Sequence, residues 1–161
     1  MEWTAIIFIG IMIYVIYLTH TGAVHKRDSG QSADSFVYQF EVQIDRTLGD
    51  YAKYECAADI KRYWINTLKR LYEKDPARTR EIANQDLRQW ALAQVSSRAF
   101  DMIASGNYHL MDTLTPEGKI LAEIYRSCLK EAFDYGYIDE ETLNKQLRTL
   151  SEQIYETGTW A

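Results

Sequence analysis

The feature that most constrains this chain is an uncharged apolar segment near its start. None of the seventeen side chains from residue 3 to residue 19 is charged, and only Thr4, Gly10 and Thr19 lack a strongly apolar side chain. A helix of this length is roughly 25 Å long, which is close to the hydrocarbon thickness of a bilayer. The segment therefore predicts a transmembrane anchor over residues 1–20.

Two other interpretations compete with an anchor. A cleaved signal peptide needs a basic N-terminal region and a shorter apolar stretch, whereas this segment is long and is preceded by Met1 and Glu2. A buried core helix is the second alternative. Trp3 at one end, with Tyr14 and Tyr17 toward the other, is typical of membrane interfaces and favours the anchor.

Basic residues beside the anchor predict its orientation. Lys26 and Arg27 follow the apolar segment, and only Glu2 precedes it. Because Lys and Arg resist translocation, we expect the N-terminus outside and the C-terminal domain in the cytoplasm. Residues 21–35 are small, polar and glycine-containing, which indicates a flexible linker.

The remainder, residues 36–161, has the pattern of a helical bundle domain. Its apolar residues mostly recur at intervals of three and four. Asp75-Pro76 and Thr115-Pro116 each place a capping side chain before a proline, which is a helix start signal. The predicted fold class is all-α, with an N-terminal single transmembrane helix followed by a four- to five-helix cytoplasmic bundle.

Five helical segments are expected in this domain. Residues 36–48 alternate as a strand would but also fit one helical face, and the lack of a second strand-like run favours a helix that breaks at Gly49. Further helices are expected over residues 51–74, 76–105 and 116–135. Gly106 and Gly136 should end the last two of these in a left-handed conformation.

The last helix should begin after Asp139 and pack back on its predecessor as an antiparallel hairpin. Leu143, Leu147, Leu150 and Ile154 follow a spacing of four, three and four, which is typical of a coiled-coil seam. This seam is a candidate surface for binding a partner or a second copy of the chain.

Few residues here carry catalytic or metal-binding chemistry. His109 is the one histidine after residue 35, and it has no neighbours with ligand spacing, so we expect no metal and no cofactor. Cys56 and Cys128 lie inside helical patterns and are predicted to be buried free thiols. No catalytic residues and no small-molecule substrate can be assigned, which argues against an enzyme.

Charge is distributed unevenly along the domain. Residues 53–81 carry eight basic and five acidic side chains, although the two signs share helix faces. Lys26, Arg27, Lys61 and Arg70 are candidates for contact with lipid headgroups, because an anchor would hold them near the bilayer. The acidic last helix disfavours nucleic acid as a partner.

Twelve tyrosines and four tryptophans are the most unusual feature of the composition. Partly exposed aromatic side chains are favoured at protein interfaces. The candidate partner interface therefore comprises Tyr51, Tyr54, Tyr63, Tyr72 and Trp90, together with the seam Leu143, Leu147, Leu150 and Ile154.

These patterns favour a membrane-anchored helical adaptor or accessory subunit. It would bind a protein partner, or a second copy of itself, at the cytoplasmic membrane face without catalysis of its own. One alternative is a membrane-tethered enzyme whose carboxylates and His109 assemble in a cleft. A further alternative is a small membrane-active effector, against which the lack of polar residues in the apolar segment argues.

Overall fold

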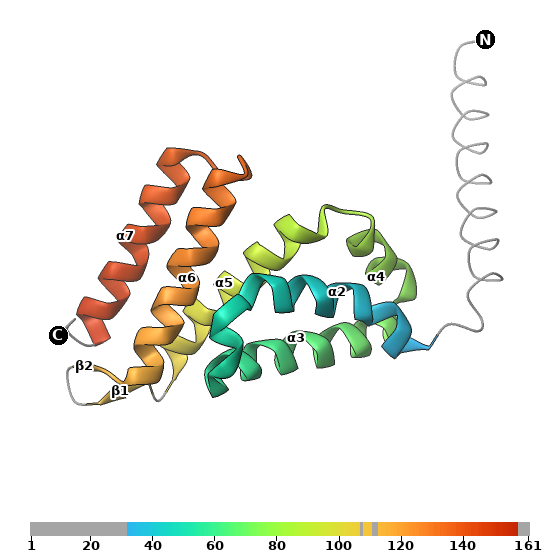
Figure 1. Ribbon diagram of the computed structural model, residues 1–161, viewed down its shortest axis with the longest axis horizontal. Coiled ribbons are helices and arrows are strands. Elements are labelled where there is room, and N and C mark those ends of the chain that lie inside the picture. The colour runs from blue at the N-terminus through green and yellow to red at the C-terminus, as the bar shows by residue number, and fades with distance from the viewer. Residues whose placement is uncertain (1–31, 107, 111–112, 158–161) are drawn as a thin grey trace, which may run out of the picture. The chain divides into compact units, whose positions relative to one another are not determined.

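The computed structural model describes residues 32–106, 108–110 and 113–157 (Figure 1). The predicted anchor and residues 21–31 of the predicted linker, which include Lys26 and Arg27, lie outside these residues. Among the helices that the structure describes, none is long and apolar enough to span a bilayer. The anchor therefore stays a prediction from the sequence.

Six α-helices account for most of the described residues and pack as a bundle, which confirms the all-α class. One more helix is present than the five expected. In chain order the elements are α2 (Ala33–Leu48), the 3-10 helix η1 (Gly49–Lys53), α3 (Glu55–Lys74), α4 (Pro76–Ala83), α5 (Leu87–Ser105), β1 (His109–Leu110), β2 (Thr113–Leu114), α6 (Pro116–Asp134) and α7 (Glu140–Thr157).

Three helix starts have the expected side-chain caps. The Asp75 carboxylate accepts a hydrogen bond from the backbone N–H of Arg78 at 3.1 Å. The hydroxyl of Thr115 accepts one from Gly118 at 3.1 Å, and Asp139 accepts one from Thr142 at 2.7 Å. Each cap satisfies a backbone donor that has no partner within the first turn of its helix.

The extra helix arises because the segment expected over residues 76–105 is interrupted. α4 ends at Ala83, and α5 begins at Leu87 after a separate cap. Asp86 provides that cap, since its Oδ1 accepts hydrogen bonds from the backbone N–H groups of Arg88 at 3.0 Å and Gln89 at 3.2 Å. The prediction of one continuous helix here was wrong.

One further expectation fails just after α5. Gly106 has extended backbone angles (φ −109°, ψ 175°), not the left-handed ones expected. A Cβ at this position would lie 2.3 Å from the carbonyl oxygen of Met102, so close backbone approach explains the glycine. After Gly106, β1 and β2 form a short antiparallel pair with His109 opposite Leu114.

The expected helix over residues 36–48 is confirmed as α2, and its buried face joins an aromatic cluster. The rings of Phe40 and Trp90 meet edge to face with centroids 5.1 Å apart, and Trp64 meets Trp90 at 5.7 Å. The indole N–H of Trp64 also donates to the carbonyl of Gln94 at 3.1 Å. This cluster joins α2, α3 and α5 through contacts that combine apolar burial with ring geometry.

α6 and α7 form the expected hairpin and lie side by side (Figure 1). Gly136 joins them with a left-handed backbone (φ 76°), as predicted. The N–H of Gly136 bonds to Phe133 O at 2.9 Å and that of Tyr137 bonds to Ala132 O at 2.8 Å, which is the Schellman arrangement. α5 packs against both α6 and α7.

Candidate functional site

Three of the predicted interface residues belong to the core. Trp90 is 8% exposed and packs in the aromatic cluster, and Leu150 and Ile154 are fully buried. Leu143 and Leu147 are half-buried. The seam of α7 is thus largely occupied by the packing of the hairpin, because a narrow apolar stripe on a terminal helix is what that packing requires.

The four predicted tyrosines are not gathered on one surface. Tyr51, Tyr54 and Tyr72 are half-buried, and Tyr63 is 39% exposed. Tyr63 and Tyr72 are nine residues apart on α3, about two and a half helical turns, so they lie on opposite faces of this helix, and Tyr54 precedes it in an extended conformation. Tyr63 pairs with α5, where the guanidinium of Arg98 lies 3.9 Å from its ring centroid.

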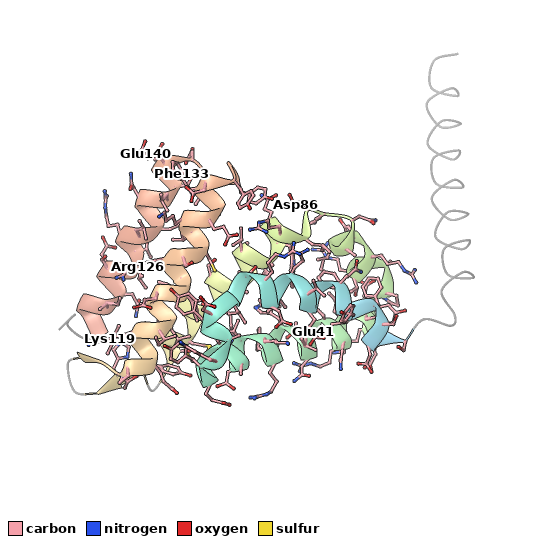
Figure 2. All side chains as sticks on the ribbon, in the orientation of Figure 1. Glu41, Asp86, Lys119, Arg126, Phe133 and Glu140 are labelled. Carbon is pink, nitrogen blue, oxygen red and sulfur yellow. The ribbon has the colours of Figure 1, made fainter. Side chains whose placement is uncertain are left out.

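Lys61 and Arg70, predicted to contact lipid headgroups, have different surroundings. The ammonium of Lys61 lies 2.8 Å from Asp45 and 3.1 Å from Glu41, both on α2, and Figure 2 labels Glu41 on that helix. The bond to Asp45 is the main cause of a raised pKa of Lys61, and the bond to Glu41 raises this pKa further. Arg70 is exposed, and its Nε donates to the carbonyl of Asn66 at 3.3 Å.

An exposed aromatic surface lies instead at the turn between α6 and α7. Phe133 is 38% exposed and Tyr135 is 55% exposed, and the rings of Tyr135 and Tyr137 stack with centroids 5.9 Å apart. The guanidinium of Arg88 covers the Tyr135 ring at 4.3 Å. Figure 2 labels Phe133 at this end of the hairpin. We call Arg88, Phe133, Tyr135 and Tyr137 the hairpin aromatic patch.

Hydrogen bonds and an ion pair hold this patch in place. The hydroxyl of Tyr137 donates to Oδ2 of Asp86 at 2.7 Å, and Arg88 pairs with Glu131 on α6. This bond to Asp86 is the main cause of the raised pKa of Tyr137. Because both contacts join α5 to the hairpin, the aromatic rings are presented from a fixed backbone.

The hairpin aromatic patch was not predicted from the sequence, for a definite reason. Phe133 fits the apolar spacing of α6, which is typical of a buried side chain. It lies in the last turn of this helix, which ends at Asp134, and 38% of it stays exposed although Ala132 beside it is buried. Two tyrosines flanking the turn glycine, in Tyr135-Gly136-Tyr137, are the sequence signal that was available.

A cavity of about 350 Å³ lies among α5, α6 and α7. Its lining residues are mainly apolar, including Leu92, Phe100 and Leu129, and none of them is charged. Two of the lining residues join α6 to α7, since the hydroxyl of Tyr125 donates to the carbonyl of Gln146 at 3.3 Å. Without an acid or a base in its walls, this cavity suits a small apolar group better than proton-transfer chemistry.

The predicted thiols are confirmed as buried and free. Cys128 lines the apolar cavity, and burial raises its pKa to about 12. Burial, followed by the charge of Glu117, also raises the pKa of Cys56. A thiol with a raised pKa is a poor nucleophile at neutral pH, because the thiolate is the reactive form.

His109 and the carboxylates do not line this apolar cavity. His109 is half-buried in β1, and its buried Nε2 has no hydrogen-bond partner among the described residues. A second, open groove between α3 and α5 has one carboxylate in its lining, that of Asp59, and His109 does not line it. Within the described part of the chain, no three His, Cys, Asp or Glu side chains come together as a metal site would require.

Comparison with known proteins gives no family assignment. A scan against protein-family models, a search of curated proteins and a search of solved structures each found no match. The function of this chain is therefore inferred from its own residues and geometry.

Proposed function

We propose that this protein is a membrane-anchored helical adaptor or accessory subunit that binds a protein partner at the cytoplasmic face. The observation that carries the proposal is the hairpin aromatic patch. Tyrosine, phenylalanine and arginine are enriched in protein interfaces and supply many of the strongest binding contacts. Tyr137 is already held by Asp86 and Arg88 by Glu131, so these two side chains lose little conformational entropy when a partner binds.

The membrane part of the proposal is supported by the sequence alone. The uncharged segment over residues 3–19 would hold the bundle near the bilayer, and Lys26 and Arg27 favour a cytoplasmic domain. An anchor and a tether concentrate a binding domain at the membrane surface, where it would meet membrane-associated partners.

Purification from native membranes tests the adaptor proposal. The full chain, solubilised in neutral detergent, should retain a protein partner in fixed proportion. The double variant Phe133→Ser/Tyr135→Ser should lose it, whereas Tyr38→Ser should not, since Tyr38 is 64% exposed but lies on α2 away from the patch. A clean monomer without a partner, or an undiminished complex with the double variant, would overturn the proposal.

Chemical labelling tests the orientation. A cysteine introduced near the C-terminus should resist a membrane-impermeant maleimide in intact cells and react once the membrane is opened. The native thiols leave the readout clear because both are buried. Modification of the introduced cysteine in intact cells would contradict a cytoplasmic domain.

A further inference from the structure

An open groove of about 500 Å³ lies between α3 and α5, and its lining is strongly basic. Arg62 and Arg70 come from α3 and Arg98 comes from α5, against the single carboxylate of Asp59. Tyr63 and Tyr108 contribute aromatic walls. We call this the arginine groove, and its lining has three positive charges and one negative charge.

Arg98 is the residue that distinguishes this groove from an ordinary charged surface. Its guanidinium carbon lies 3.9 Å from the ring centroid of Tyr63, which is a cation–π contact. Its Nε is buried and has no hydrogen-bond acceptor. Among the described residues, no carboxylate lies within ion-pairing distance of Arg98, so a half-buried positive charge is left without a counter-ion from this part of the chain.

The other two arginines can turn toward the same ligand. Arg62 lies 2.6 Å from Asp59 and 3.5 Å from Glu55, but its side chain is largely exposed, and such surface pairs are weak. Arg70 forms no ion pair with the described residues, and its Nε contacts only the neighbouring carbonyl of Asn66. Guanidinium groups from two helices can therefore meet one anion.

We propose that the arginine groove binds a small molecule through a phosphate group. A carboxylate has two oxygens, whereas a phosphate group offers up to three free oxygens and about two negative charges, which match three guanidinium groups and a net charge of +2. The groove is larger than a phosphate ion, and Met102 and Tyr108 provide a surface for an attached organic group. This site is on α3 and α5, separate from the hairpin aromatic patch, and goes beyond the adaptor function.

Titration calorimetry of the full chain in neutral detergent tests the proposal with inorganic pyrophosphate as the probe. We expect wild-type protein to bind it and Arg98→Gln and Arg70→Gln each to bind about tenfold more weakly, since each loses a charged hydrogen-bond donor. Arg70 is exposed, so its substitution should leave folding intact. Arg78→Gln is the matched control, because Arg78 is also exposed but lies on α4 and pairs with Glu81.

A second arm identifies the source of the phosphate. The same proteins are titrated with neutral-detergent micelles with and without phosphatidic acid, a lipid with a terminal phosphate group. Binding of pyrophosphate that depends on Arg98 supports a soluble ligand. Binding only to the phosphatidic acid micelles, with the same dependence on Arg98, supports a lipid headgroup in the same groove. Failure to bind either probe, or an equal loss with Arg78→Gln, would overturn the proposal.

Discussion

The hydroxyl of Tyr137 donates a hydrogen bond of 2.7 Å to Oδ2 of Asp86, while Oδ1 of the same carboxylate caps α5. One side chain thus starts a helix and also holds the turn that follows α6. Figure 2 labels Asp86 at the start of α5. Because Tyr137 stacks on Tyr135, this bond also fixes the exposed rings of the hairpin aromatic patch.

Removing the Tyr137 hydroxyl should weaken the fold in a pH-dependent way. The bond from Tyr137, followed by that from the Gln89 N–H, lowers the pKa of Asp86. A carboxyl with a lowered folded-state pKa stabilises the protein above its unfolded pKa and loses this effect as pH falls through the folded value. We therefore expect Tyr137→Phe to lower the urea midpoint of unfolding slightly at pH 7, and the difference from wild type to shrink as the pH falls through the folded-state pKa of Asp86.

The stabilisation that the Tyr137–Asp86 bond provides should also be lost at alkaline pH. The folded-state pKa of Tyr137 is raised, so its contribution is complete below the unfolded tyrosine pKa and is lost as pH rises through the folded value. Tyr38→Phe is the control, because Tyr38 is exposed on α2. Equal effects of the two substitutions at pH 7 in urea titrations would argue against the Asp86 bond.

The native thiols should be protected from modification. Burial raises the pKa of Cys128 to about 12, so at pH 8 a disulfide reagent should react with it only after unfolding. The raised pKa also means that Cys128 contributes stability that is lost as pH rises from about 9 to about 12, because the unfolded thiol ionises first. Rapid reaction of either thiol in the native protein would contradict this environment.

Gly118 should not tolerate a methyl group. A Cβ at this position in the first turn of α6 would lie 2.7 Å from the carbonyl oxygen of Tyr108 and 3.2 Å from a Leu114 methyl. We expect Gly118→Ala to reduce the free energy of unfolding by about 1–3 kcal/mol through overpacking. At an exposed position inside a helix, replacing glycine by alanine would instead raise the free energy of unfolding by roughly 0.5–1 kcal/mol.

Gly136→Ala should also destabilise the protein, but for a different reason. A Cβ at this position would meet no described atom within 4 Å, but the backbone has φ 76°. The expected loss of about 1–2 kcal/mol comes from left-handed strain alone. Urea unfolding of both variants checks the pair, and a stabilising effect of alanine at position 118 would contradict the close packing of α6 on the β1–β2 segment.

The helices were predictable where local signals agreed. Proline after Asp75 and after Thr115 marked two starts, and Gly136 marked one end, because caps and left-handed turns depend on adjacent residues. The break before α5 was missed because it contains neither proline nor glycine. Asp86 followed by Gln89 fits the spacing of a capping box and was the available signal.

The surfaces were less predictable than the helices, because exposure depends on which elements meet. Trp90 and Phe133 are both large aromatic residues on helical stripes, yet Trp90 is 8% exposed and packs on Phe40 and Trp64, whereas Phe133 is 38% exposed. The arginine groove combines side chains that are about thirty residues apart, such as Arg70 and Arg98. Periodicity within one helix contains no information on such pairings.

Site-specific photo-crosslinking in native membranes tests the central claim most directly. A benzophenone side chain replaces Tyr135 in the full chain, and Glu152, exposed on α7, is the control position. The proposed function predicts one discrete protein adduct from position 135, lost when Phe133→Ser is added, and none from position 152. No adduct from position 135, or the same adducts from both positions, would contradict partner binding at the hairpin aromatic patch.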